Sequence, residues 1–424
     1  MSTATLWDRI GPYDARRNKV ALGMWIVLLL SYIINTMDRQ VFSVLATDVR
    51  ASLDLTVPQV GLAATIFTLG MGLGGIPTAY LMTRMTRINI VYIGIFTFSA
   101  ATALVAFSQG IADLLVYRFV SGIGEAMQLA ALLAIGATYF ANHRAIATSS
   151  VLFTFGIGAI LGPNLGAALL DSYGWRVPLI TFGLAAVPIL ILIMFVTRSW
   201  FTEYSPAEQL EEQEASQASG TDAVPVDLGA DRMTDSEPVL LALATALAGL
   251  AIYGYLGLYP TFLREQVGFT AGDAGVAVSA YGLGAMLALI GGWMGDRFDY
   301  FMVLFGALVV AGISGYFLFT HIESLAIQVA LSFVFGASIS GFVYGNLSAG
   351  IIKSMKRDLV GKASGLFVVS LYLPAAFAGL VMAELAEAYS WSAAGAIQIT
   401  GLCVAAGILA LFTRRARMQR VART

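Results

Sequence analysis

Long apolar runs recur along the whole chain and limit what it can fold into. The stretches 22–34, 239–259 and 393–412 carry no charged residue. Because a helix rises 1.5 Å per residue, crossing the ~30 Å hydrocarbon core of a bilayer takes about 20 apolar residues. Only 12% of the 424 residues are charged, whereas a soluble domain has about 25%. The sequence therefore predicts an all-α integral membrane protein.

Twelve such spans can be placed, and all but one of their connections are short. In the exception, 198–238, a run of glutamates precedes a stretch of Ser, Gly, Asp and Pro that is too polar to bury a core. We expect 1–197 to form a six-helix bundle, 198–238 a flexible cytoplasmic linker, and 239–424 a second six-helix bundle with a basic cytoplasmic tail. The predicted spans are 20–46, 57–82, 88–109, 112–140, 147–171, 177–197, 239–265, 271–294, 300–320, 325–352, 361–388 and 392–413.

The distribution of Lys and Arg predicts the orientation, since cytoplasmic loops of membrane proteins are enriched in both. Of the 24 such residues, 19 fall on the side of the N-terminus, two lie within spans, and only Arg50, Arg176 and Arg264 fall on the opposite side. Both termini are therefore expected in the cytoplasm, with the protein in the inner or plasma membrane. The net charge of −2 gives no basic excess for nucleic acid. The expected partners are the bilayer and a small solute, and the chain is expected to function as a monomer.

The two halves of the chain repeat each other. Residues 79–84 after the second span parallel 292–297 after the eighth, and 172–175 after the fifth parallel 388–391 after the eleventh. Internal duplication is typical of secondary transporters, whose binding sites lie near the midplane between the repeats.

Several motifs resemble those of the major facilitator superfamily over essentially the whole chain. Residues 292–297 match its Gly-x-x-x-Asp-Arg loop, while the first-half copy is degenerate, with Ala79 for Gly and Thr83 for Asp. Residues 118–124 and 158–166 resemble its fourth-span and fifth-span motifs. The resemblance implies twelve transmembrane helices in two pseudo-symmetric six-helix bundles.

The Gly-x-x-x-Asp-Arg loop also predicts a gate. Asp296 and Arg297 are expected to contact a neighbouring helix end on the cytoplasmic side rather than the substrate. The spans carry no His-x-x-x-His cluster, Ser/His dyad or paired cysteines, so the sequence predicts a transporter and not an enzyme.

Four ionisable residues lie within apolar spans: Asp38 and Arg39 in the first, Arg118 and Glu125 in the fourth. A charge at the bilayer centre costs at least ~2.5–3.5 kcal/mol on insertion scales, so each must face a cavity or a partner. A seven-residue spacing, two helical turns, places Arg118 and Glu125 on one face. A carboxyl group in such a cavity can bind a proton near neutral pH, and a neighbouring arginine opposes that binding. The alternative is buried pairs that only fix helix packing.

The residues around these charges resemble two branches of the superfamily. Residues 37–40 (Met-Asp-Arg-Gln) and 122–126 (Gly-Ile-Gly-Glu-Ala) are similar to the anion:cation symporters and to the spinster-like transporters of lysolipids and sphingoid phosphates. In both branches this resemblance implies that Asp38 and Glu125 couple transport to protons. We expect proton-coupled symport of a small organic anion, foremost a carboxylate, with no cofactor besides the proton. A spinster-like lysolipid carrier and a drug–proton antiporter are the alternatives.

Other polar residues within the spans extend the predicted substrate site beyond Arg39 and Arg118. Tyr253 and Tyr255 lie in a glycine-rich span that ends in a proline, and we expect them to face the cavity rather than anchor the interface. Asn35, Gln128 and Asn346 are also predicted to contact substrate, although such groups can instead join helices.

The orientation can be tested by cysteine labelling. In a Cys403→Ala background, cysteines at Ser219 and Arg420 should resist a membrane-impermeant maleimide added to intact cells, because both positions are predicted to be cytoplasmic. A cysteine at Glu323, in the loop between the ninth and tenth spans, should react and serves as the control. Labelling of either of the first two positions in intact cells would overturn the orientation.

Overall fold

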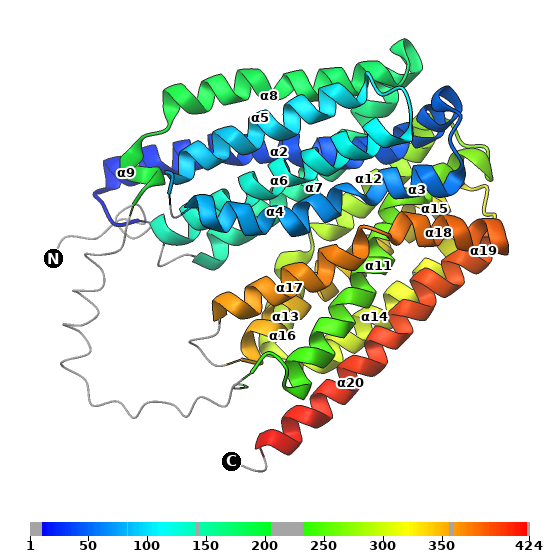
Figure 1. Cartoon of the computed structure of the whole chain (residues 1–424). Coiled ribbons are helices and arrows are strands. Elements are labelled where there is room, and N and C mark those ends of the chain that lie inside the picture. The colour runs from blue at the N-terminus through cyan, green and yellow to red at the C-terminus, as the bar shows by residue number, and fades with distance from the viewer. Residues whose placement is uncertain are drawn as a thin grey trace.

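The computed structural model describes residues 11–82, 84–140, 144–204, 230, 232–355 and 360–421. Within these residues, twelve helical segments are long and apolar enough to cross a membrane. This confirms the predicted all-α membrane fold. The helices form two bundles, one from each half of the chain (Figure 1).

The N-terminal half contains the first six spans, of which the second is divided at Ile66. Helix starts follow local capping: the Thr56 hydroxyl accepts a hydrogen bond from the Gln59 N–H, and the Gln59 side chain accepts one from the Thr56 N–H, a capping box. The helices are α2 (Ala15–Leu53), α3 (Val57–Thr65), α4 (Phe67–Met82), α5 (Arg87–Val105), α6 (Ile111–Tyr139), α7 (Arg144–Tyr173), α8 (Arg176–Val196) and the short α9 (Ser199–Thr202).

The C-terminal half contains the other six spans, several of them interrupted. Two include π-helical turns, η2 and η4, a form that is rare and often found at functional sites. The elements are α11 (Ser236–Glu265), α12 (Ala271–Ala285), α13 (Ala288–Arg297), α14 (Tyr300–Leu318), α15 (Leu325–Gly336), η2 (Ala337–Tyr344), α16 (Gly345–Lys353), α17 (Val360–Ala375), α18 (Ala378–Ala388), α19 (Trp391–Ala394), η4 (Gly395–Gly401) and α20 (Leu402–Val421).

The halves meet at one end of the molecule and diverge at the other. The start of α2 and the end of α20 lie at what we call the terminal end, and the loop between α2 and α3 lies at the opposite, far end (Figure 1). Between the halves, α2 packs on α11, α7 on α12, and α3 on α18. The ribbons of the two bundles separate toward the terminal end (Figure 1).

Two ion pairs join the halves at the far end. Arg264 of α11 lies 2.5 Å from the carboxylate of Asp48 in α2, and Arg50 of α2 lies 2.9 Å from that of Glu265 in α11. Their side chains are 15 to 33% exposed. Water therefore reaches both pairs.

A close helix crossing lies beside these ion pairs. Gly61 in α3 and Gly379 in α18 approach so closely that a Cβ on either would overlap the backbone of the other. Next to them, the Thr65 hydroxyl donates a hydrogen bond of 2.9 Å to the carbonyl of Ala376, at the break between α17 and α18. This contact ties the break in the second span to the break in the eleventh.

Two predicted boundaries need correction. The first span was predicted at 20–46, but α2 covers 39 residues, about 58 Å at 1.5 Å per residue, so it extends beyond the bilayer core. The predicted linker began at 198, yet α9 packs on the N-terminal half with Phe201 fully buried. The reason is local: the Glu203 carboxylate accepts hydrogen bonds from the backbone N–H groups of Arg87 and Ile88, where α5 begins.

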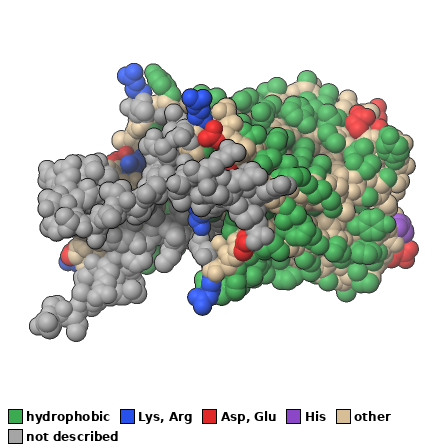
Figure 2. Space-filling view, turned by 90° about the horizontal axis from the view of Figure 1, so that it is seen from below, with side chains coloured by type: hydrophobic (Ala, Val, Ile, Leu, Met, Phe, Trp, Pro, Cys, Tyr) green, Lys and Arg blue, Asp and Glu red, His purple; other side chains and the backbone are tan. Residues whose placement is uncertain are grey.

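Large apolar side chains cover the flanks of the described bundle. Figure 2 shows many hydrophobic side chains over the part of one face that is not drawn in grey, with charged groups toward its edges. Examples on several helices are Phe96 (67% exposed), Phe195 (74%) and Ile313 (57%). A contiguous exposed apolar surface of this kind suits lipid rather than water.

Candidate functional site

An ion pair between the first and fourth spans forms the centre of the site. The Nε of Arg39 in α2 donates a hydrogen bond of 2.9 Å to Oε2 of Glu125 in α6. Both side chains are buried, at 3% and 0% exposure. Removing one partner of such a pair would leave an uncompensated charge in a low-dielectric interior. Each residue therefore depends on the other.

A chain of amides holds the arginine in place. The Nη2 of Arg39 donates to Asn35, which donates to Gln128, which in turn donates to the hydroxyl of Ser31, at distances of 3.2, 2.9 and 2.8 Å. Positions 31, 35 and 39 lie four residues apart on one face of α2. The structure thus brings the predicted residues Asn35 and Gln128 to Arg39 and Glu125.

Asp38 lies apart from Arg39. Its Oδ2 accepts a hydrogen bond of 2.5 Å from the Thr102 hydroxyl in α5, and its Oδ1 is buried with no partner among the described residues. Consecutive helical residues point about 100° apart. Asp38 therefore contacts α5, whereas Arg39 contacts α6. The Oε1 of Glu125 is also buried without a described partner. Each carboxyl group therefore keeps one oxygen available.

Arg118 stabilises the break in the second span rather than pairing with an acid. Its Nε and Nη2 donate to the carbonyls of Ala63 and Ala64, at 3.2 and 3.3 Å, where α3 ends. Carbonyls freed at a helix end need donors. No described carboxylate lies within 4.0 Å of Arg118. The shared face predicted for Arg118 and Glu125 therefore does not produce an ion pair.

Phe67 joins the two arginines to the C-terminal half. Its ring centroid lies 5.8 Å from the Arg39 guanidinium and 4.9 Å from that of Arg118, within range for cation–π attraction. On its other side the ring contacts Tyr253 of α11, with centroids 6.1 Å apart. Phe67 is the first residue of α4, directly after the break at Ile66.

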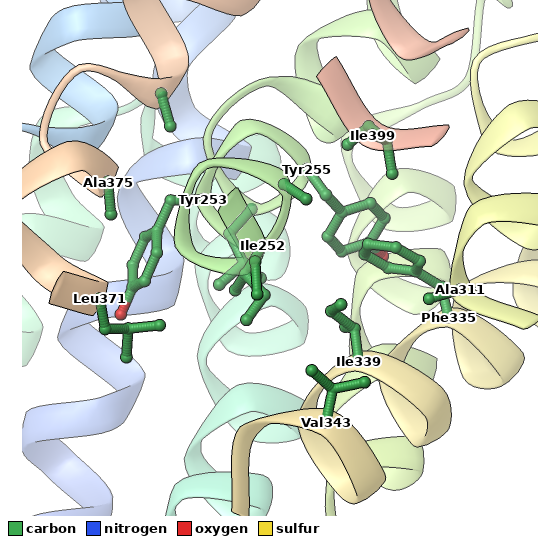
Figure 3. Packing of buried hydrophobic residues seen from close by; sticks show 14 of the residues in the cluster. Ile252, Tyr253, Tyr255, Ala311, Phe335, Ile339, Val343, Leu371, Ala375 and Ile399 are labelled. Carbon is green, nitrogen blue, oxygen red and sulfur yellow. The ribbon is translucent and has the colours of Figure 1, made fainter. Parts of the chain in front are cut away.

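Tyr253 and Tyr255 point to opposite sides of α11 (Figure 3). Tyr253 faces α17, where its ring lies 6.0 Å from that of Tyr372. Tyr255 stacks on Tyr259 and Tyr281 and shares a hydrogen bond with Ser332. The structure therefore brings Tyr253 to the site and places Tyr255 in the core of the C-terminal half, contrary to prediction.

The other predicted residues lie elsewhere. The Asn346 amide donates to the carbonyls of Gly291 and Phe342, so it joins helices and does not meet Arg39. The side chain of Asp296 is outside the described residues. Arg297 is exposed at the end of α13, with its guanidinium 6.0 Å from the Trp293 ring. The gate predicted for these two residues stays a prediction.

Four site residues were missed from the sequence: Thr102, Phe67, Tyr372 and Phe155, whose ring lies 5.9 Å from the Arg39 guanidinium. Thr102 is a polar residue in a span and belongs to a class that often lines such sites. The two phenylalanines carry no such signal, because lipid-facing phenylalanines look the same in sequence.

Comparison with known proteins identifies the class of protein that this fold and site define. The profile of the Major Facilitator Superfamily matches residues 28–379 and, in a second match, 241–423. The chain belongs to this superfamily. It is a multi-pass membrane transporter and not an enzyme.

Individual relatives agree with this assignment. The chain is 28% identical to a putative metabolite transport protein of Haemophilus influenzae, covering 66% of this chain and 69% of that one. It is 22% identical to the cis,cis-muconate transport protein of Acinetobacter baylyi (82% and 85% covered) and 24% identical to the gallate transporter of Pseudomonas putida (76% of each). In fold it is similar to a bacterial homolog of the human lysosomal transporter Spinster, inward-facing and unoccupied (TM-score 0.71, 17% identity, 95% and 97% covered).

The ion pair predicts a specific order of stabilities. Glu125→Gln removes the counterion of buried Arg39, a loss of about 3–5 kcal/mol for such pairs, whereas Asp38→Asn keeps an oxygen for the Thr102 hydroxyl. Purified Glu125→Gln should therefore unfold at a clearly lower temperature than Asp38→Asn. Arg39→Gln combined with Glu125→Gln should recover part of that loss because no lone charge remains. Equal unfolding temperatures for Glu125→Gln and the double variant would show that the pair does not matter.

Proposed function

We propose that this protein moves a small organic anion, a carboxylate, across the cell membrane by proton-coupled alternating access. The observation that carries the proposal is the buried Arg39–Glu125 pair, which reaches the C-terminal half through Phe67 and Tyr253. A substrate held between two halves that open in turn must bind at such a junction.

Charge balance supplies the coupling. In the structure, the guanidinium of Arg39 is neutralised by Glu125. When a substrate carboxylate takes the place of Glu125 on the guanidinium, the site holds two carboxylates and one guanidinium. Its net charge is then −1. Uptake of one proton by Glu125 restores neutrality, so anion and proton enter together. The Oε1 of Glu125, which has no partner among the described residues, is where that proton can bind.

Asp38 is a second proton site in this proposal. Its Oδ1 is buried with no partner in the part of the chain that the structure describes, and its hydrogen bond to Thr102 connects α2 to α5. A proton on this carboxyl group would change the charge next to the Arg39–Glu125 pair without touching substrate. Asp38 is therefore suited to linking protonation to the position of α2.

Relatives and helix packing bear on the choice of substrate. The muconate and gallate transporters named above carry organic anions, which supports a carboxylate. A lysolipid carrier would be favoured by a side opening between helices. Instead, Asn164 in α7 donates a hydrogen bond of 2.6 Å to Ser279 in α12, and Gly156 and Gly282 bring the same helices into close contact. The close packing of α7 on α12 therefore does not support a lysolipid carrier.

Arg39→Lys tests anion binding. Lysine keeps the charge but loses the planar fork that grips a carboxylate with two hydrogen bonds. We expect the variant to fold and its apparent affinity in proteoliposome counterflow to weaken roughly tenfold or more, the value of one charge-assisted hydrogen bond. Arg176→Lys, an exposed far-end arginine, is the control and should behave as wild type. Unchanged affinity in Arg39→Lys would remove this residue from the binding site.

Neutral variants of the two acids test coupling. Uptake driven by a pH gradient should collapse in Asp38→Asn and in Glu125→Gln, because a fixed neutral group cannot follow the gradient. Exchange of carboxylate at equal pH should survive in any variant that remains folded, since it moves no net proton. Asp113→Asn, which keeps an acceptor at the start of α6, should retain gradient-driven uptake. A well-folded double variant that still concentrates carboxylate on a proton gradient would refute the coupling.

A further inference from the structure

Two aromatic rings of the N-terminal half lie against Arg39, and two tyrosines of the C-terminal half extend the group. Phe67 of α4 and Phe155 of α7 lie 5.8 and 5.9 Å from its guanidinium. Tyr253 of α11 contacts Phe67 with an interplanar angle of 60°, and Tyr372 of α17 contacts Tyr253 at 61°. Four helices thus contribute one ring each to a single cluster, which we call the ring cluster: Phe67, Phe155, Tyr253 and Tyr372.

Three of the four rings of the ring cluster are buried. Phe67 is 3% exposed, and Tyr253 and Tyr372 are each 6% exposed. Phe155 is partly exposed. Edge-to-face contacts hold Phe67, Tyr253 and Tyr372 in a fixed relative orientation. Binding does not have to assemble these three rings.

We propose that the substrate is an aromatic carboxylate, whose acid group pairs with Arg39 while its flat ring packs within the ring cluster. This inference rests on the proposed function and adds the chemical class of the substrate. A planar π-system presents a negative face and a positive edge, and it can meet the faces and edges of the four rings in turn. The planar guanidinium also stacks on aromatic rings.

A saturated ring lacks these contacts. Cyclohexanecarboxylate has the same charge and nearly the same size as benzoate, but its puckered ring has no π-face or polarised edge. One or two favourable aromatic contacts correspond to about tenfold in affinity. The pair of ligands therefore isolates the ring from the carboxylate.

The experiment compares these two ligands on the purified full-length protein. Binding of benzoate and of cyclohexanecarboxylate is measured by calorimetry and by the rise in unfolding temperature that ligand binding causes. Succinate, an aliphatic diacid, is included as a third probe. We expect benzoate to bind about tenfold more tightly than cyclohexanecarboxylate.

Two matched variants on α7 test whether the preference for benzoate over cyclohexanecarboxylate depends on the ring cluster. Phe155→Leu removes the partly exposed ring of the cluster and should reduce the benzoate preference several-fold. Phe153→Leu removes a ring that is 42% exposed on the same helix and has no contact with the arginine among the ring–cation pairs described. It should leave the preference unchanged.

Each result has a distinct meaning. Equal affinity for the two ring acids, or tighter binding of the saturated acid or succinate, would overturn the aromatic class while leaving a carboxylate transporter in place. A benzoate preference that Phe155→Leu does not alter would also overturn the role of the cluster. Failure of all three acids to bind would overturn the proposed function and this inference together.

Discussion

A positive charge that cannot stand alone in a low-dielectric interior organises the N-terminal half. Arg39 is held by Glu125 and Asn35, and Asn35 is held in turn by Gln128. These contacts fix the rotation of α2 against α6, because any other rotation would bury the guanidinium without a partner. In the proposed transport cycle, the same requirement limits the groups that can displace Glu125 from Arg39 to those that carry a negative charge.

The fold and the ionisable residues within the spans could be predicted from the sequence. The residues that contact them could not. Apolar runs of bilayer length form helices in a membrane. A charged residue within such a run must face a cavity or a partner. Partners depend on how each helix is rotated against its neighbours, which periodicity does not specify. Asp38 therefore met Thr102 rather than Arg39, and Tyr255 faced away from Tyr253 (Figure 3).

The break in the second span shows how a backbone requirement and the site are connected. Breaking a helix in the membrane frees carbonyls that water cannot satisfy, and Arg118 supplies the donors at Ala63 and Ala64. Phe67, the residue after the break, lies within cation–π distance of both Arg118 and Arg39. An arginine that the sequence predicts to bind substrate thus donates hydrogen bonds to the backbone at a helix end.

The far-end ion pairs have a consequence for how readily the protein changes state. Arg264–Asp48 and Arg50–Glu265 are partly exposed, and pairs of this kind contribute about 0–1 kcal/mol each. Water can therefore replace both ion pairs at little cost in free energy. Dissolved salt also weakens these ion pairs, because it screens exposed charges. The balance between the two faces of the carrier is therefore open to adjustment by the ionic strength of the medium at the far end.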